Sequence, residues 1–522
     1  MSDRSRTVGI DLGTTNSAMA VLTMNEPEII PNSSGNRTTR SVVSFTDEGA
    51  VVVGKEAVNK LITDPEQTVE QVKREMDNDG WEIEAHGESY DPQQVSALII
   101  EKLVADAEDY LGEDVDSVVI TVPAYFSEKE IQATKNAGEI AGVTVEGVKK
   151  EPSAACLAYG VKEGQQEVDA EDEELAFVYD LGGGTFDATL VDIASDYSNL
   201  ETKSTEGDHD LGGEDWTSRI VDSITDQIEE DTGVDVAEDR EQYGRVRDAA
   251  VTAKHSLSQS QSTNITIPFV VPEQSYNYEN EFTRDQFEEL TSDLLENTLD
   301  CCDRLFDRVD YSPDDVDTVL LVGGSTRMTQ CEDATREYFG KDPVKKVNPD
   351  EAVAIGAAMF ADISETAGEN IADILPGDAS NVLMTEVVPQ SFGVELADGS
   401  LDALIEQDEA IPATADDEYT NAHDGQETMN VRIHQGEVHD NANAEENTYI
   451  GNLRLEIRNP KPRGGVTATV TFEIDVDGTL AVEARDEETG EEVQASFESI
   501  FHLSEKELEG KQKALPDQEG AT

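Results

Sequence analysis

Two segments far apart in the chain share one pattern of apolar and polar positions. TVGIDLGTTNSAMAVL (7–22) and AFVYDLGGGTFDATLV (176–191) each contain an apolar run ending in Asp, a Leu-Gly pair, a short polar loop and a second apolar run. Apolar runs joined by glycine-containing turns are typical of buried strands, so we predict a strand–turn–strand unit at each position. The copies are too far apart for a solenoid repeat, and they predict two related lobes.

Helical and strand patterns alternate around these units. Two segments end in Gly and have helical spacing, and the second also begins with Ser followed by Glu three residues later, as in a capping box: 96–112 and 127–142. An apolar run that leads into a proline turn predicts a buried strand at 117–126. A further strand followed by a Gly-Gly turn is predicted at 318–328, and a helix with Pro in its first turn at 348–363.

The periodicity changes to two beyond about residue 380. In TMNVRIHQGE, Met429, Val431 and Ile433 fall on one face of a strand, and VTATVTFEIDVDGTLAVEARD (466–486) alternates in the same way around a DG turn. We therefore predict an α/β domain, an interdomain linker, an antiparallel β-sandwich and a short helical start, with the boundaries 1–380, 381–386, 387–503 and 504–522. The last part opens with a capping box at Ser504–Glu507.

The charge of the chain is extreme. Its 522 residues include 37 Lys and Arg against 114 Asp and Glu, a formal net charge of −77, and the acids are spread through every segment. A distributed excess of this kind indicates solvation in a salt-rich cytoplasm, where the self-repulsion is screened. Nucleic acid and anionic membranes are excluded as partners, because phosphates are bound by basic residues.

Cysteine usage and hydropathy place the protein in the cytosol. The four cysteines form neither a CxxC motif nor a metal-ligand spacing, and we expect one of the adjacent Cys301 and Cys302 to face the core and the other to face away. The N-terminus enters a strand pattern directly, and no run of 18 apolar residues occurs. These features predict a soluble, cytoplasmic protein.

The glycine loops leave two interpretations open, an ordinary tight hairpin or a loop that binds phosphate. Glycines let backbone N–H groups approach a polyphosphate closely, and the hydroxyls of Thr14, Thr15 and Thr185 add donors. Aspartates repel phosphate, so in such a site they hold a cation or its waters, for which Mg²⁺ is the suitable ion. Neither a GxxxxGK[ST] loop nor a GxGxxG motif occurs, which excludes two large nucleotide-binding classes.

Seven motifs in order identify a family. GIDLGTTNS, VITVPAYF, EPSAACLAYG, DLGGGTFD, LGGEDW, LVGGSTRM and NPDEAVAIGAA together resemble the 70-kDa heat-shock protein chaperones of the DnaK type, from about residue 7 to about residue 505. The resemblance implies a two-lobed, actin-like ATPase domain coupled through an apolar linker to a β-sandwich that binds extended hydrophobic segments of unfolded polypeptides. Under this reading the glycine loops are both hairpins and halves of a phosphate clamp.

The resemblance also implies roles for individual residues. The catalytic set comprises Lys73, which positions the attacking water, with Thr185, Asp180, Glu151 and Asp11. The nucleotide is expected to contact Asp11, Thr14, Thr15, Asn16, Gly182, Gly183, Gly184, Thr185, Lys254, Ser258, Gly323, Gly324, Ser325, Arg327 and Asp350. The metal-shell carboxylates are Asp11, Glu151, Asp180 and Asp187. The interdomain switch comprises Pro123, Val382, Leu383 and Met384, and the peptide groove comprises Val394, Tyr419, Ala422, Met429 and Val431.

The implied cofactors are ATP, Mg²⁺ and K⁺, and the implied partners are unfolded polypeptides, a J-domain co-chaperone and a nucleotide exchange factor. Several positions depart from the family pattern. The linker carries Thr385 and Glu386, Ile131 replaces the arginine of the proline-switch relay, and Gly147 stands where an arginine docks J-domain proteins. Val251 and His255 change the adenine contacts, and Met429 fills the central peptide pocket.

Two further functions stay open beside the ATP-driven chaperone. The departures at the linker, Ile131 and Gly147 fit a weakly coupled holdase or a regulator of one partner, whereas Lys73, Glu151 and Thr185 fit a working ATPase. A sugar or acetate kinase on the same scaffold has no need of the sandwich. Residues 504–522 match only the beginning of the family's helical lid, so we expect a lidless chaperone that exchanges its clients quickly.

Overall fold

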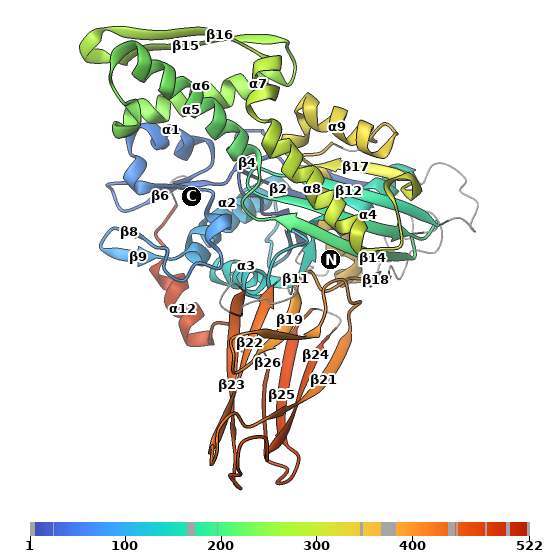
Figure 1. Ribbon diagram of the computed structural model, residues 1–522. Helices are drawn as coiled ribbons and strands as arrows, with labels where there is room; N and C mark the ends of the chain where they lie inside the picture. Colours follow the sequence, from blue (N-terminus) through green and yellow to red (C-terminus); the bar gives the residue numbers. More distant parts are fainter. Residues whose placement is uncertain are drawn as a thin grey trace.

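The structure is a computed structural model. It describes the residues 6–23, 26–163, 173–195, 197–344, 348–366, 383–436, 444, 447–475, 478–496 and 502–518. A broad α/β body forms the upper part of the molecule, and a β-sandwich extends from one side of it (Figure 1). The body consists of two lobes, which we call lobe I (residues 7–150) and lobe II (residues 174–344).

Lobe I is built on a sheet in the order β11-β10-β1-β2-β3, with β4 paired to β2. Its strands are β1 (Thr7–Asp11), β2 (Asn16–Thr23), β3 (Glu26–Ile29), β4 (Thr39–Arg40), β10 (Ser117–Val122) and β11 (Thr144–Lys150). β1 and β2 pair antiparallel, which confirms the first predicted hairpin, and β10 pairs parallel to β1. Smaller sheets join β5 (Val42–Phe45), β6 (Val51–Val53) and β7 (Thr68–Glu70), and β8 (Ile83–Ala85) with β9 (Glu88–Tyr90).

Predicted signals mark the end of one helix of lobe I and the start of another, whereas the first helix was not predicted and the second begins four residues before the predicted range. The helices are α1 (Lys55–Thr63), α2 (Pro92–Leu111) and α3 (Glu128–Ile140). α2 ends at Gly112, whose φ of 70° is the left-handed conformation that glycine adopts without a steric cost. α3 begins at Ser127 with the predicted capping box to Glu130.

Lobe II repeats the plan of lobe I. Its sheet has the order β17-β12-β13-β14-β18, with β12 (Glu174–Leu181), β13 (Phe186–Ile193), β14 (Asn199–Asp208), β17 (Thr318–Val322) and β18 (Leu383–Thr385). β12 and β13 form the second predicted hairpin and pair antiparallel along their whole length. Another hairpin of lobe II, which was not predicted, joins β15 (Ser262–Val271) and β16 (Tyr276–Thr283). The helices of lobe II are α5 (Gly213–Thr232), α6 (Arg240–Leu257), α7 (Arg284–Leu290), α8 (Ser292–Arg308) and α9 (Thr329–Phe339).

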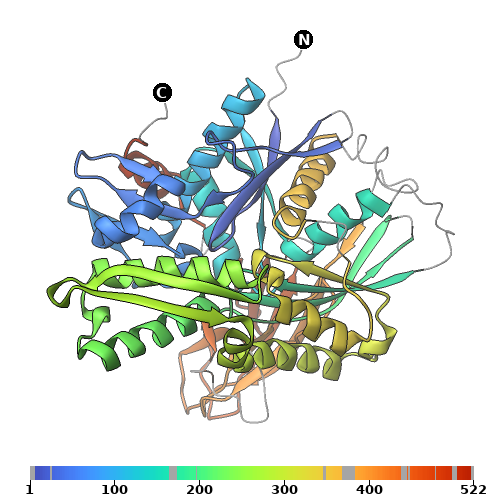
Figure 2. The same cartoon turned by 90° about the horizontal axis from the view of Figure 1, so that it is seen from above.

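Two helices pack against each other between the lobes, α4 (Glu151–Glu163) and α10 (Ala352–Thr366). Their alanines share one core with strands of both sheets, including Ala18 and Val178, so the lobes meet over a common apolar centre. Figure 2 shows the two lobes side by side from above, with the sandwich beneath them. Pro349 lies in the turn before α10 and not in its first turn, because the helix begins only at Ala352.

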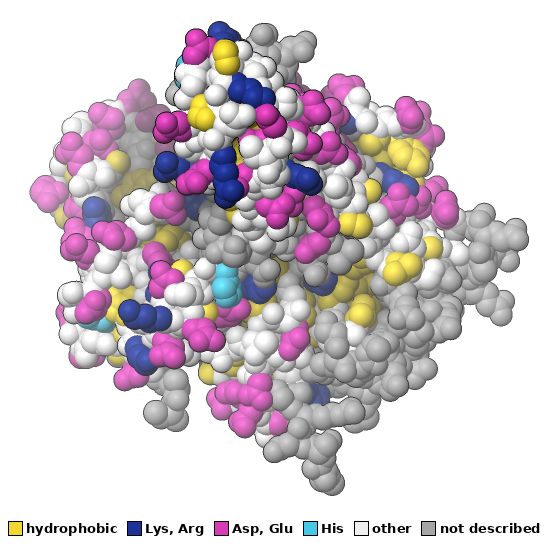
Figure 3. All heavy atoms as spheres, turned by 90° about the horizontal axis from the view of Figure 1, so that it is seen from below, with side chains coloured by type: hydrophobic (Ala, Val, Ile, Leu, Met, Phe, Trp, Pro, Cys, Tyr) yellow, Lys and Arg dark blue, Asp and Glu magenta, His cyan; other side chains and the backbone are white. Residues whose placement is uncertain are grey.

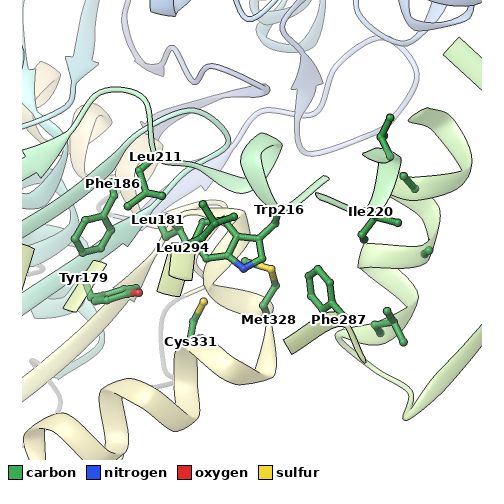
Figure 4. Packing of buried hydrophobic residues seen from close by; sticks show 14 of the residues in the cluster. Tyr179, Leu181, Phe186, Leu211, Trp216, Ile220, Phe287, Leu294, Met328 and Cys331 are labelled. Carbon is green, nitrogen blue, oxygen red and sulfur yellow. The ribbon is translucent and has the colours of Figure 1, made fainter. Parts of the chain in front are cut away.

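The core of lobe II centres on Trp216, which lies near the start of α5. Its side chain is fully buried, and Leu181, Leu294 and Met328 belong to the same core (Figure 4). Burying a side chain of this size contributes roughly 1.5–3 kcal/mol or more to the free energy of folding. Cys301 and Cys302 are both buried in this core, so the expectation that one faces away is wrong.

The sandwich consists of two four-stranded sheets, β20-β19-β22-β23 and β21-β24-β25-β26. Its strands are β19 (Ser391–Glu395), β20 (Leu401–Ile405), β21 (Ala413–Thr420), β22 (Thr428–Gly436), β23 (Thr448–Glu456), β24 (Thr467–Ile474), β25 (Leu480–Asp486) and β26 (Glu492–Ser496). All neighbours pair antiparallel, and Met429, Val431 and Ile433 face the core as the period-two pattern predicts.

The sandwich is joined to the body at two places. The segment before it forms β18 (Leu383–Thr385), which pairs parallel with β14 at the edge of the lobe II sheet. The segment after it forms α12 (Glu505–Ala514), which contacts α3 of lobe I (Figure 1). Val382, one of the predicted switch residues, lies outside the described residues.

The surface carries the acidic excess of the composition. Asp and Glu side chains are spread over the face seen from below, with fewer Lys and Arg between them (Figure 3). No helix among the described residues is long and apolar enough to cross a membrane.

Candidate nucleotide site

A cleft of about 1030 Å³ lies between the lobes, and it brings most of the predicted site residues together. Those that line it are Asp11, Thr14, Thr15, Asn16, Lys73, Glu151, Asp180, Gly182, Gly183, Thr185, Lys254, Ser258, Gly323, Gly324, Ser325, Arg327 and Asp350. Gly184 and Asp187 are not among the lining residues. Residues from segments more than 300 positions apart therefore share one cavity.

The two hairpin turns face each other across this cleft at distances that only glycine permits. A Cβ atom on Gly183 would lie 1.9 Å from the Oγ1 atom of Thr15, and one on Gly184 would lie 2.6 Å from the Cγ2 atom of Thr14. Because real Cβ atoms do not approach other atoms so closely, the glycines are required for the two loops to close on one another.

Lobe II holds its own glycine loop through the loop's carbonyl groups. The N–H of Gly213 donates to Gly182 O at 3.0 Å, and the N–H of Glu214 donates to Gly183 O at 2.9 Å. The hydroxyl of Ser325 also donates to Gly182 O, at 2.7 Å. In a trans peptide the C=O and the following N–H point in opposite directions, so these bonds turn the next N–H groups away from α5.

Four buried or half-buried carboxylates stand at strand and helix ends around the cleft. Burial, together with the charge of Glu151, raises the pKa of both Asp11 and Asp187 to about 7. Burial and the neighbouring Glu151 raise the pKa of Asp180 well above its usual range. A bound cation relieves this mutual repulsion, which favours a site for a positive ion.

The carboxylates do not form a direct chelating cluster. Among the described residues, no group of three or more His, Cys, Asp or Glu side chains is close enough to hold a metal ion directly. Oxygen ligands that stand apart suit Mg²⁺, which usually keeps several of its waters. The donor set therefore fits a hydrated magnesium ion held through its waters.

Lys73 is buried in the cleft and paired. It lies in a short 3₁₀ turn (Val72–Glu75), its side chain is 5 % exposed, and its Nζ atom donates to Glu151 Oε1 at 2.8 Å. The ammonium also lies 5.4 Å from the centre of the Phe126 ring. A buried amine of this kind is stable only with such partners, and they fix its place in the cleft.

The far end of the cleft can accept a nucleoside. The guanidinium of Arg327 is fixed by two hydrogen bonds to Asp350, at 2.6 and 3.0 Å. Burial lowers the pKa of Lys254 to about 8, and burial with the charge of Lys254 lowers the pKa of His255. Val251 and His255 also line the cleft.

Two arginines at or near the cleft were missed by the sequence reasoning: Arg40, and Arg74, which is not among the lining residues. Arg40 lines the cleft, and burial lowers the pKa of its guanidinium. Arg74 spans the two lobes. Both stand in a chain with only 37 basic residues, and this scarcity was the signal that could have found them.

The predicted switch residues that the structure describes are Pro123 in lobe I and Leu383 and Met384 in the linker. Pro123 begins the turn in which the N–H of Tyr125 donates to Asp187 Oδ1 at 3.0 Å, so this turn of lobe I is tied to lobe II. In the linker, Leu383 is 67 % exposed, whereas Met384 packs against the core between the lobes. Glu386 accepts hydrogen bonds from the hydroxyls of Ser153 and Thr202, at 2.6 and 3.1 Å.

The predicted groove residues mostly lie in the core of the sandwich. Val394, Met429 and Val431 are buried there, and Tyr419 packs against the same core and donates its hydroxyl to Asp402 at 2.9 Å. Ala422 lies in the turn after β21, outside this cluster. Four of the five predicted groove residues therefore belong to the apolar core of the sandwich or pack against it.

The fold and the cleft define a class: a two-lobed protein whose facing glycine loops and buried lysine suit nucleoside triphosphate chemistry, with an attached β-sandwich. Comparison with known proteins gives the family. The family profile described as Hsp70 protein matches residues 7–519. Two relatives named Chaperone protein DnaK, from two strains of Halobacterium salinarum, are each 40% identical over 508 residues, covering 97% of this chain and 77% of the relative.

The chain belongs to the Hsp70 family, whose members are ATP-dependent chaperones and ATPases. The family resemblance inferred from the seven motifs is thereby confirmed. The weakly coupled holdase is not favoured.

Proposed function

We propose that the cleft binds ATP and hydrolyses it, and that the sandwich holds extended apolar segments of unfolded polypeptides. The observation that carries this proposal is the convergence of both glycine loops with the buried Lys73–Glu151 pair in one cavity. Glycine amides and threonine hydroxyls are suited to the phosphates, and the Lys73 ammonium is suited to orienting water at the terminal phosphate.

The cofactor assignment follows from the donors. Asp11, Glu151, Asp180 and Asp187 would hold Mg²⁺ through its waters, and the ion when bound supplies charge neutralisation at the phosphates. The same oxygen-rich region is our proposed place for K⁺. The roles of Lys254, Ser258 and Arg327 with Asp350 at the nucleoside are supported by their position in the cleft.

Coupling between the two parts is supported by the contacts of the linker. β18 adds to the lobe II sheet, and Glu386 reaches Ser153 on α4, the helix that begins with Glu151. A client that moves the sandwich can therefore act on the helix that carries a cleft carboxylate. We propose that Pro123, Leu383 and Met384 transmit this change, and that Val394, Tyr419, Ala422, Met429 and Val431 contact the client once the groove opens.

The expected setting is a salt-rich cytoplasm, supported by the net charge of −77 and by relatives from Halobacterium salinarum. A J-domain co-chaperone and a nucleotide exchange factor are proposed partners on family grounds, and Gly147 argues for an altered J-domain contact.

The test is steady-state ATP hydrolysis in molar KCl, with and without an extended apolar peptide. We expect turnover that the peptide raises several-fold. A matched peptide in which the apolar residues are replaced by serine serves as the control. An ATP hydrolysis rate that neither peptide changes would show that the linker contacts do not couple the cleft to the sandwich. ATP binding without hydrolysis would contradict the assignment of the cleft.

A further inference from the structure

Arg74 directly follows Lys73 in the sequence. Its side chain extends from lobe I to lobe II. Its Nε and Nη2 atoms both donate to the carbonyl of Gly184 in the lobe II loop, at 3.0 and 2.6 Å. Its Nη2 atom also donates to Asp215 Oδ2 at 2.9 Å, and the side chain is only 18 % exposed. One residue of lobe I thus holds two points of lobe II.

The Gly184 carbonyl completes a series of three. The carbonyls of Gly182 and Gly183 are bound by N–H groups at the start of α5, which belongs to lobe II itself. The third carbonyl of the loop is bound by Arg74, which belongs to lobe I. Because each bound C=O turns the next N–H the opposite way, Arg74 sets the direction of the Thr185 N–H.

The second point that Arg74 holds is rigid. The Asp215 carboxylate also accepts the N–H of Gly212 at 2.7 Å, which closes the first turn of α5. The next residue, Trp216, is fully buried in the lobe II core (Figure 4). Arg74 therefore contacts the start of α5 and the glycine loop of lobe II with one planar group.

We propose that Arg74 is a positioning residue that completes the phosphate loop of lobe II only when the two lobes are closed. This inference rests on the proposed function of the cleft. Since Lys73 and Arg74 are consecutive, closing the lobes places the Lys73 ammonium and orients the Thr185 amide in the same movement. An open cleft keeps the first two carbonyl bonds and loses the third.

The arrangement needs arginine and not merely a positive charge. A guanidinium is planar and presents several N–H donors in a fixed fork, so it can bind a carbonyl and a carboxylate together. A lysine at this position has a single nitrogen, so it loses the second hydrogen bond that Nε donates to the Gly184 carbonyl. Arg74→Lys is therefore the variant that keeps the charge and loses the geometry.

The experiment compares Arg74→Gln and Arg74→Lys with Arg219→Gln. Arg219 is a partly exposed residue of α5 and pairs with Asp293, so its replacement also removes one positive charge beside α5 but leaves the Gly184 loop and the cleft untouched. Single-turnover hydrolysis, ATP and ADP affinity, and thermal unfolding are measured for each variant in molar KCl.

We expect Arg74→Gln and Arg74→Lys to hydrolyse ATP about 10- to 100-fold more slowly than the wild type, as for a misplacement of reacting groups. ADP affinity and the unfolding temperature should stay close to those of Arg219→Gln. Hydrolysis within twofold of wild type in either Arg74 variant would overturn the proposal. A parallel loss of rate, ADP affinity and thermal stability would also overturn it, since that pattern indicates a purely structural residue.

Hydrogen exchange of the backbone amides of residues 182–186 keeps the inference separate from the proposed function. Arg74→Gln should speed exchange at these amides by about tenfold relative to Arg219→Gln, whether or not ATP turns over. Unchanged exchange would overturn the positioning role even in an active enzyme. Absence of turnover in the wild type with faster exchange in Arg74→Gln would instead contradict the proposed function alone.

Discussion

The cleft between the lobes and the junction between the lobes and the sandwich are both held by polar contacts. They are built differently. In the cleft the pair of Lys73 and Glu151 is buried, and it joins the 3₁₀ turn of lobe I to the start of α4. At the junction, Arg308 of α8 pairs with Asp408 of the sandwich at 2.6 Å, and the arginine side chain is 26 % exposed.

The two contacts differ in the free energy that is lost when one partner is removed. Removing one partner from a buried pair costs several kcal/mol, about 3–5, because a charge is left without compensation. An ion pair near the surface contributes about 0–1 kcal/mol and is screened by salt. The geometry of the cleft is therefore fixed by the packed framework around it. The stability of the junction, in contrast, depends on the salt concentration.

Lys73→Ala should have the largest effect on the cleft side of this comparison. Without the ammonium nothing orients the attacking water, so we expect single-turnover hydrolysis to fall by about 100-fold or more. ATP binding should stay within about threefold, since the glycine loops and threonines remain. Rapid-quench hydrolysis and equilibrium nucleotide binding measure the two quantities.

Lys55→Ala is the matched control, because Lys55 is exposed at the start of α1 in the same lobe. It should leave both quantities unchanged. Normal turnover in Lys73→Ala would remove this residue from the mechanism, and loss of ATP binding would show that it is part of the phosphate site.

Lowering the salt should separate the two contacts. The chain carries a net charge of −77, and the screening length grows from about 3 Å at 1 M to about 10 Å at 0.1 M. The few attractive pairs at the junction are then outweighed by repulsion between two acidic parts. As KCl falls from molar to about 0.1 M, we expect peptide stimulation to be lost first, followed by compactness and cooperative unfolding.

ADP affinity and circular dichroism, followed over the same series, decide the order of these losses. ADP binding should persist to lower salt than peptide stimulation does. A cooperative melting curve that does not change with salt would contradict the salt adaptation, and simultaneous loss of both functions would erase the distinction between cleft and junction.

Breaking the junction itself should have a smaller effect. Asp408 accepts hydrogen bonds from the Ser204 hydroxyl and the Thr205 N–H as well as from Arg308, so Asp408→Asn weakens several contacts with lobe II at once. We expect peptide stimulation of the ATPase to fall about two- to fivefold in Asp408→Asn and in Arg308→Gln, with basal turnover unchanged. The double variant should lose less than the product of the two.

Arg304→Gln provides the control, because Arg304 lies one turn earlier on α8 and pairs with Glu206 but not with the sandwich. A loss of stimulation in Arg304→Gln equal to that in Arg308→Gln would attribute the effect to the charge of α8. Additive effects in the double variant would deny a direct coupling between Arg308 and Asp408.

The sequence predicted the cleft better than the junction, for a physical reason. The two hairpins, the α3 capping box and the Gly112 helix end depend on neighbours within a few residues, and the glycine loops carry their chemistry in adjacent letters. The Arg308–Asp408 pair joins residues 100 positions apart, and no local pattern marks either residue in so acidic a chain.

Packing of whole elements accounts for the remaining differences. Cys301 and Cys302 are both buried because α8 contacts β13 and β14 within a core that surrounds it, whereas adjacency on a helix predicted only one buried face. Arg74, like Lys73 beside it, is one of the few basic residues in an acidic chain, so composition marks both residues equally. The role of Arg74 depends on a carbonyl that another lobe supplies, and this only the tertiary structure reveals.

The smallest expected effect concerns the second attachment of the sandwich, through residues 511–518. Val51 donates its N–H to Asp517 O at 3.0 Å, Gln518 Nε2 donates to Leu98 O at 2.7 Å and to Glu101, and Leu515 packs on the core of lobe I. Burial raises the pKa of Glu101 to about 7, and the neighbouring Asp517 adds to this. Release of the segment exposes Glu101 and returns its pKa towards 4.5.

Because the docked form binds the proton more tightly, this carboxyl favours docking fully below about pH 4.5, and the contribution is lost as the pH rises through about 7. Hydrogen exchange at Val51, corrected for intrinsic rates, should therefore quicken as the pH rises from 5.5 to 8. The amide of Gly54, which donates to Val42 O, is the control and should not change. Glu101→Gln, which stays neutral, should abolish the pH dependence at Val51. If the pH dependence at Val51 persists in Glu101→Gln, another titratable group controls the docking of residues 511–518. The half-exposed second attachment then differs from the buried cleft only in its response to salt.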